Sequence, residues 1–222
     1  GDRRSPRIMR KGENAMPTEY AIEMKGITKT FGSVVANRDV ELNVRQGEIL
    51  ALLGENGSGK TTLMNMLSGI YFPDEGEILV EGRPIRITCP QDAIKNRIAL
   101  VSEDRKVYGL VLCRSIKENI SLPNLRRLHR EPFIQSGREK AEVTKYKEAL
   151  GIKCAGIHVS TGTLSGGNQQ KVIFGKWLER SPSVFMMDDP TRGIDVGAKY
   201  EIYELIINMA TVSYTHLTLP TI

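Results

Sequence analysis

The stretch "LALLGENGSGKTTL" constrains the fold more than any other part of this 222-residue chain. An apolar run is followed, from Gly54 to Thr61, by the pattern G-x-x-x-x-G-K-T, and a helix-forming segment comes next. A loop that cradles phosphates needs this order, because its backbone N–H groups turn inward and the helix N-terminus points at the anion. A glycine-rich loop that merely turns is the alternative, and the strand–loop–helix setting argues against it. The chain is therefore predicted to bind a nucleoside triphosphate.

Each residue type in this loop suits a contact with phosphate or its metal ion. The glycines allow tight turns, Lys60 supplies a point charge for the β- and γ-phosphates, and the Thr61 hydroxyl is a candidate Mg²⁺ ligand. The predicted nucleotide-binding residues are the whole loop and the two threonines that end it: Gly54, Glu55, Asn56, Gly57, Ser58, Gly59, Lys60, Thr61 and Thr62.

The remainder of the chain alternates between strand-like and helical patterns. Short β-prone runs such as "YAIEM", "DVELNV" and "EILALL" come first, and the later run "SVFMMDD" is apolar on both faces, as in a parallel sheet covered by helices. Residues 104–163 are polar and more helical. These patterns predict an α/β core with an inserted helical section.

A second motif, "LSGGNQQK", lies just before "SVFMMDDP". The order of phosphate loop, LSGG and an apolar strand ending in acid resembles the ATPase domains of ABC transporters. The resemblance covers residues 20–210 and is closer still to the ATPases of bacterial monosaccharide and nucleoside importers. It implies an α/β P-loop NTPase fold of the ABC ATPase type, with an antiparallel β subdomain and a helical insert subdomain at about residues 104–163.

The resemblance also implies roles for particular residues and partners. In this family Ser165, Gly166 and Gly167 would contact the γ-phosphate bound to a partner domain, while a second ATPase domain, as a homodimer or a fused partner, completes the site. Asp188 would hold Mg²⁺ through water, and Asp195 would lie in the loop that crosses to the partner. Phe31 would stack on adenine, although a core aromatic is the alternative. The implied cofactors are ATP and Mg²⁺. The implied partner is a permease in the inner membrane, and the implied location of the chain is the cytoplasmic face of that membrane.

Three departures from the family pattern bear on activity. Asp189 stands where a glutamate usually polarises the attacking water, so its carboxylate is about one methylene shorter in reach. Glu103 stands where a glutamine usually touches Mg²⁺, and the alternative is an ordinary solvated acid. Lys60, Asp189 and Glu103 form the predicted catalytic set, and Thr61, Asp188 and Glu103 form the predicted metal site.

The third departure is the end of the chain, "TVSYTHLTLPTI". Its histidine, His216, lacks the apolar strand that would precede the family's γ-phosphate-sensing histidine. We therefore expect a nucleotide-binding domain over residues 16–210 that lacks its last strands, with an atypical tail over 211–222. The front of the chain resembles the first domain of the two-domain importer ATPases and the back resembles the second. A natural single-domain relative, an internal deletion and an assembly artefact would each explain this join.

Three functional hypotheses follow from these patterns. The first is an ATPase that energises sugar or nucleoside import, and the second is an ATP-binding module with little turnover, favoured by Asp189 and the missing histidine. The third, action on nucleic acid, relies on the net charge of +5. Residues 1–15, expected to be a disordered leader, hold five basic and two acidic residues, which leaves the remainder near neutral. Nucleic acid is therefore not a predicted partner.

Overall fold

The computed structural model describes residues 19–130, 133–211 and 215–219. The predicted leader, residues 1–15, lies outside the described residues, as do parts of the predicted tail. Within the described part, a four-stranded parallel sheet has the order β3-β10-β9-β6. Its strands are β3 (Ile49–Ala51), β10 (Thr215–Leu219), β9 (Val184–Asp188) and β6 (Ile98–Val101). Because parallel strands end at the same edge, the residues that follow β3, β6 and β9 meet there.

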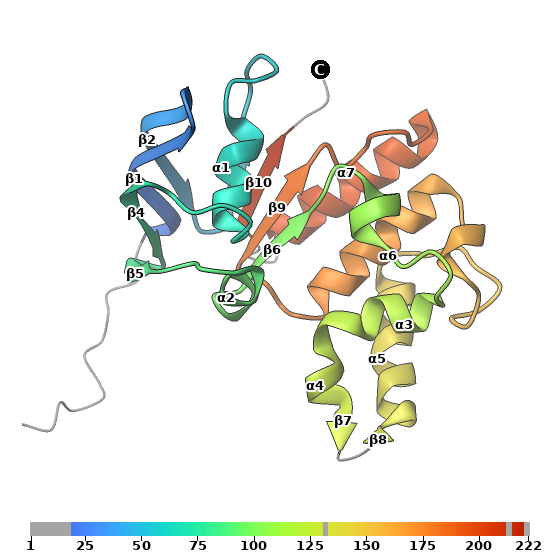
Figure 1. Ribbon diagram of the computed structural model, residues 1–222. Helices are drawn as coiled ribbons and strands as arrows, with labels where there is room; N and C mark the ends of the chain where they lie inside the picture. Colours follow the sequence, from blue (N-terminus) through green and yellow to red (C-terminus); the bar gives the residue numbers. More distant parts are fainter. Residues whose placement is uncertain (1–18, 131–132, 212–214, 220–222) are drawn as a thin grey trace, which may run out of the picture.

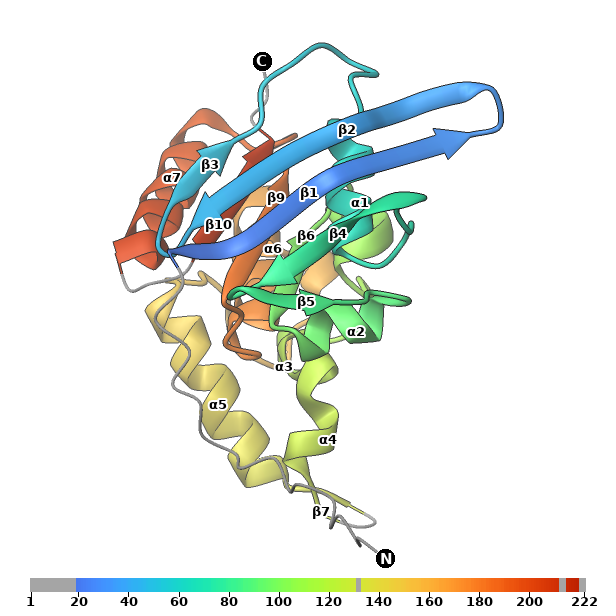
Figure 2. The same cartoon turned by 90° about the vertical axis from the view of Figure 1, so that its left-hand side faces the viewer.

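A second, antiparallel sheet packs beside this core (Figures 1 and 2). Its order is β2-β1-β4-β5, with β2 (Val34–Arg45), β1 (Tyr20–Phe31), β4 (Glu75–Val80) and β5 (Arg83–Ile85). The long β1–β2 ribbon carries several irregularities in register. This sheet is the expected antiparallel β subdomain.

Helices cover both faces of the parallel sheet. The two on the side of the antiparallel sheet are α1 (Lys60–Leu67) and α2 (Pro90–Lys95), and the two on the other side are α6 (Gly166–Leu178) and α7 (Val196–Thr211). Alternate residues of β9 serve the two faces. Val184 and Met186 join the core under α1, whereas Phe185 and Met187 join the core under α6 and α7. Burial on both faces explains why "VFMM" shows no polar alternation.

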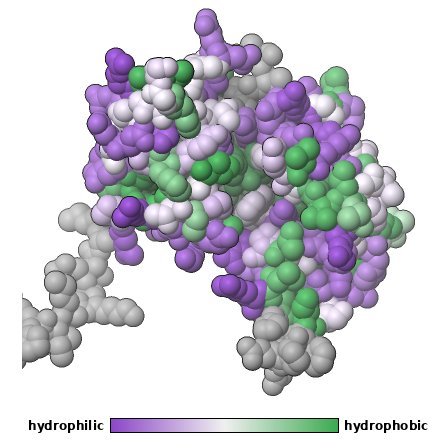
Figure 3. Space-filling model, viewed as in Figure 1, coloured by the Kyte–Doolittle hydropathy of each residue, from purple (hydrophilic) through white to green (hydrophobic). Residues whose placement is uncertain are grey.

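The segment between β6 and α6 forms the helical insert. Its elements are η1 (Arg105–Gly109, a π-helical turn), α3 (Ile116–Ser121), η2 (Leu122–Asn124), α4 (Leu125–Leu128), the short hairpin of β7 (His129–Arg130) and β8 (Phe133–Ile134), α5 (Ser136–Ala149) and η3 (Thr161–Thr163). Apolar side chains lie exposed on it, among them Val107, Tyr108, Val111 and Leu122. Figure 3 shows apolar colour gathered over the insert. Such a surface suits contact with a protein partner.

One part of the fold differs from the expectation. Residues 215–219, expected in a tail outside the domain, form β10 in the middle of the parallel sheet, where they pair with β3 and β9. Without β10, both neighbours would present unpaired N–H and C=O groups to each other, so a paired strand is strongly favoured there. The run "THLTL" can form a strand, but its two leucines give only a weak apolar signal.

Glu179, the C-cap residue of α6, has a buried carboxyl side chain. Its side chain is 4% exposed, and its Oε2 has no hydrogen-bond partner within the described structure. Burial, reinforced by the charge of Glu142, raises the pKa of Glu179 from 4.5 to about 7. The folded protein therefore binds a proton here more tightly than the unfolded chain does, so the contribution of Glu179 to stability is fully present below pH 4.5 and is lost as the pH rises through about 7.

We expect Glu179→Gln to remove this pH dependence. At pH 8 the variant should gain up to about 3 kcal/mol in free energy of unfolding, because the buried charge is gone, and near pH 4.5 it should match the unsubstituted protein. Urea unfolding at both pH values measures the difference. Glu148→Gln, at an exposed position of α5, is the control and should change stability equally little at both. An equal effect of Glu179→Gln at both pH values would contradict the assignment.

Candidate functional site

The predicted phosphate loop connects β3 to α1 at the carboxyl edge of the parallel sheet. Gly57 and Gly59 both have φ of +84°, a left-handed conformation that favours glycine. A Cβ at Gly59 would come within 2.3 Å of the Ala36 carbonyl oxygen in β2. The loop therefore needs glycine here both for its turn and for its close packing on the antiparallel sheet.

Lys60, the first residue of α1, places its ammonium group across the loop. Its Nζ donates to the carbonyl oxygens of Gly54 at 2.6 Å and Glu55 at 2.7 Å, and to Ser58 Oγ at 3.0 Å. These contacts hold the positive charge inside the curve of the loop. The charge and the N-terminus of α1 together create a position that favours an anion.

A cavity of about 660 Å³ opens over this loop. We call it the loop cavity, and its lining combines the loop, three carboxylates and three residues of β2: Gly54, Glu55, Asn56, Gly57, Ser58, Gly59, Lys60, Thr61, Thr62, Glu103, Asp188, Asp189, Val34, Val35 and Ala36. The structure thus brings together the predicted loop, catalytic and metal residues, although they come from three distant parts of the sequence. The β2 residues carry no motif and were not predicted.

Asp188 ends β9 and Asp189 follows it, and both line the loop cavity. Burial and then the neighbouring charge of Asp189 raise the pKa of Asp188, while Lys60 opposes this rise. Asp189 has φ of +42°, a left-handed conformation that aspartate tolerates better than most residues. A cation in the cavity would favour the ionised form of Asp188.

The residues around the pair fit a magnesium ion that is also bound to phosphate. Thr61 and Asp188 both line the loop cavity and offer hydroxyl and carboxylate oxygens, the hard ligands that Mg²⁺ prefers. The described residues contain no group of three or more His, Cys, Asp or Glu side chains that could hold a metal alone. Mg²⁺ characteristically completes such a partial set with water and phosphate oxygens.

Glu103, the third predicted metal ligand, follows β6 and forms an ion pair with Arg192 in the loop after β9. It also lines the loop cavity. An ordinary solvated acid was the alternative for this residue, and the Glu103 side chain, 44% exposed, is compatible with it. Its role toward a metal stays a prediction.

The LSGG segment begins α6 at a distance from the loop cavity. Ser165 is the N-cap of α6, and its Oγ accepts from Asn168 Nδ2 at 2.9 Å. Neither Ser165 nor Gly166 nor Gly167 lines the loop cavity. Packing gives a further reason for the glycines, because a Cβ at Gly167 would lie 2.6 Å from Ala198 Cβ in α7. Contact with a nucleotide on a partner domain stays a prediction.

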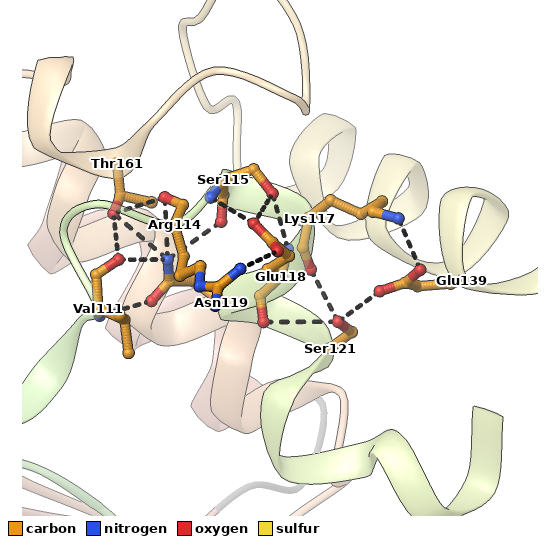
Figure 4. A network of polar contacts seen from close by, with 9 residues as sticks. All are labelled: Val111, Arg114, Ser115, Lys117, Glu118, Asn119, Ser121, Glu139 and Thr161. Atoms are coloured by element: carbon orange, nitrogen blue, oxygen red, sulfur yellow. Dashed lines mark hydrogen bonds and ion pairs between the residues drawn. The ribbon is translucent and has the colours of Figure 1, made fainter. Parts of the chain in front are cut away.

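A network of polar contacts in the insert includes Thr161, which lies just before the LSGG segment in the sequence (Figure 4). The buried amide of Asn119 accepts from Val111 N at 2.8 Å and donates to Val111 O at 3.0 Å and to Thr161 Oγ1 at 3.3 Å. Thr161 lies four residues before Ser165. The capping box of Ser115 and Glu118 fixes the start of α3 beside it. Asn119 was missed because a lone asparagine carries no motif.

Two further predicted residues lie outside the loop cavity lining. Asp195 receives a hydrogen bond from Ala198 N at 2.9 Å, which satisfies an N–H group at the start of α7. Phe31, 42% exposed at the end of β1, meets the Tyr71 ring edge-to-face at 5.1 Å, and Lys29 Nζ lies 5.5 Å from the Phe31 ring. Phe31 is therefore no core aromatic. Its stacking on adenine, like the contact of Asp195 with a partner, stays a prediction.

His216 occupies an interior register position of β10. It is paired with Ile49 and Phe185, whereas Leu219 is paired with Asp188 at the carboxyl edge. Three residues of strand correspond to about 10 Å. The backbone position of His216 is thus well removed along the strand from the edge that carries the carboxylates.

A second cavity, of about 520 Å³, adjoins the loop cavity between α1, α2, β6 and the start of the insert. Thr61, Glu103 and Asp188 line both cavities, and the second one extends to Tyr108 and Trp177. The site is therefore open toward the exposed apolar face of the insert.

Comparison with known proteins assigns this arrangement to a family. The family model described as ABC transporter matches residues 37–192. The ribose import ATP-binding protein RbsA of Geobacillus kaustophilus is 47% identical over 78% of this chain and 35% of its own length. The xylose import ATP-binding protein XylG of Thermoanaerobacter pseudethanolicus is 43% identical over 86% of this chain and 38% of its own. The chain thus spans about a third of the length of the curated relatives it matches.

Solved structures show the same fold. A nucleotide-free ATP-binding cassette from an ABC transporter superposes with a TM-score of 0.79 at 24% identity, covering 91% of this chain and 81% of that one. The ADP conformation of another ABC transporter cassette gives 0.77 at 25% identity, covering 91% and 82%. Sequence motifs, site geometry and fold agree, and the chain belongs to the ABC transporter family of ATP-binding domains.

Proposed function

We propose that this chain binds and hydrolyses Mg²⁺-ATP and that the hydrolysis energises import of a sugar or nucleoside through a membrane permease. One observation carries the proposal: the loop cavity gathers the phosphate loop with Asp188 and Asp189. Relatives named as ribose and xylose import ATP-binding proteins support the substrate class.

Each residue of the chain has a distinct task in this proposal. Lys60 and the loop N–H groups hold the β- and γ-phosphates, and Thr61 and Asp188 hold Mg²⁺, which neutralises phosphate charge when bound. Asp189 orients the attacking water and accepts its proton. Glu103 lines the loop cavity and forms an ion pair with Arg192, so we propose that it contacts Mg²⁺ when the nucleotide is bound.

Two partners belong to this proposal, a second ATPase domain and a membrane permease. A second ATPase domain, in a homodimer or a fused partner, would place its Ser165–Gly167 segment against the phosphates in the loop cavity. The permease would contact the insert, where Val107, Tyr108 and Val111 are exposed. Among the described helices, none combines the length and hydropathy of a membrane span. We propose that the chain acts at the cytoplasmic face of the membrane through that contact.

A second candidate is an ATP-binding domain with little or no turnover. Two observations favour it: Asp189 has a shorter reach than glutamate, and His216 lies in the interior of β10. Nucleotide binding by titration, together with phosphate release from Mg²⁺-ATP, separates the two candidates. Binding with turnover supports the ATPase, binding alone supports the second candidate, and the absence of binding contradicts both. Light scattering with and without ATP tests dimerisation in the same samples.

A further inference from the structure

Arg105 lies at the junction of three segments that carry site residues. It opens η1, two residues after Glu103, and the turn is capped by Asp104, whose Oδ1 accepts from Lys106 N at 2.9 Å and Val107 N at 3.1 Å. The cap fixes the backbone from which the Arg105 side chain extends. Its guanidinium can therefore act as a rigid link between elements.

The guanidinium donates to two segments that are far apart in the sequence. Nη1 donates to the Arg192 carbonyl oxygen at 2.5 Å and Nη2 to the Gly193 carbonyl oxygen at 3.0 Å, both in the loop that follows Asp188 and Asp189. Nε donates to Gln169 Oε1 at 3.4 Å, and Gln169 is a buried residue in the first turn of α6. Three nitrogen atoms of one planar group thus donate at once. A lysine, whose donors all sit on a single nitrogen atom, cannot reproduce this spacing.

The surroundings of Arg105 are shaped to admit it. A Cβ at Gly166 would lie 3.0 Å from Arg105 Nη2, so the first glycine of the LSGG pair leaves room for the guanidinium. Gly193, whose carbonyl accepts from it, has φ of +61°. The ion pair of Glu103 with Arg192 links the same two segments a second time. These contacts therefore connect the loop after β9, the η1 turn and the N-terminus of α6.

We propose that Arg105 is a positioning residue that holds the loop after the Asp188–Asp189 pair in register with the Ser165–Gly167 segment. Arg105 does not line the loop cavity, and it acts through the backbone carbonyl groups of Arg192 and Gly193. The catalytic consequence depends on the proposed ATPase function. The structural link itself does not.

The test compares Arg105→Lys with the unsubstituted protein by two measurements. Amide hydrogen exchange should become faster in residues 189–195 and 165–169, because two carbonyl contacts are lost, and should stay unchanged in β1 and β2. In the same variant kcat for Mg²⁺-ATP should fall about 10- to 100-fold while the nucleotide Kd stays within about twofold, since misplacement by about 1 Å costs roughly that much in rate.

Arg97→Lys is the matched control. Arg97 Nε also donates to a backbone carbonyl, that of Ser181 at 3.1 Å, but at the opposite end of β6. We expect this variant to leave kcat and the exchange of residues 189–195 unchanged. Unchanged exchange in Arg105→Lys, or faster exchange throughout the protein, would overturn the link. Localised faster exchange with unchanged kcat would overturn the catalytic role. If the unsubstituted protein shows no turnover, the proposed function fails while hydrogen exchange still decides the link.

Discussion

Replacing Lys60 with alanine is expected to lower Mg²⁺-ATP turnover by at least about 100-fold. The Lys60 ammonium lies within 3.0 Å of three oxygen atoms of the phosphate loop, so its charge lies inside the curve of the loop, where phosphate is predicted to bind. Removing one preorganised electrostatic group from such a site typically costs about 10² to 10³ in kcat. Phosphate release under saturating Mg²⁺-ATP measures the loss, and titration with nucleotide shows whether binding falls with it.

A matched lysine variant separates this effect from a general loss of positive charge. Lys95, in α2, is exposed and pairs with Asp92 on the protein surface. Lys95→Ala removes the same charge and should leave turnover unchanged, because surface pairs contribute little and lie outside the loop cavity. Turnover by Lys60→Ala within about tenfold of the unsubstituted protein would show that the loop cavity is not where ATP is hydrolysed.

The phosphate loop illustrates what could be predicted from local pattern. Its glycines, its lysine and the apolar strand before it are neighbours in sequence, and their tasks are local: to turn, to hold a charge and to start α1. The parallel arrangement of β9 was also predictable, since "VFMM" has no polar alternation and so must be covered on both faces. The site roles of Asp188 and Asp189 came from the family resemblance, and the common edge at which parallel strands end is the physical reason why the pair lies beside the loop.

Interactions between distant segments could not be predicted in this way. Arg105 reaches Gly193 across 88 residues, and Asn119 reaches Thr161 across 42. No motif with a fixed spacing marks either contact in the sequence, because each contact depends on how distant segments pack together. β10 was missed for a different reason. Its pairing partners on both sides favour a strand where its own composition gives only a weak signal.

Asp189→Glu is expected to raise Mg²⁺-ATP turnover, by about 10- to 100-fold. Asp189 borders the loop cavity beside Asp188, but its carboxylate reaches less far than that of glutamate by on the order of 1.3 Å. A displacement of about 1 Å in a catalytic group can cost roughly 10²-fold in rate. Glutamate has a cost of its own, because φ of +42° at this position suits aspartate better. Turnover and urea unfolding must therefore be measured together.

Two companion variants decide how a change in rate is read. Asp189→Asn keeps the size and backbone preference but removes the proton acceptor, so it should lower turnover where Asp189→Glu raises it. The double variant Lys60→Ala with Asp189→Glu should have no turnover, which ties any gain to the loop cavity. If Asp189→Glu binds ATP and remains folded yet turns over no faster, the length of this side chain does not limit the rate. The position of His216 then becomes the stronger explanation for slow chemistry. Its backbone lies three residues before the carboxyl end of β10, and lengthening the side chain at Asp189 does not bring a histidine to the γ-phosphate.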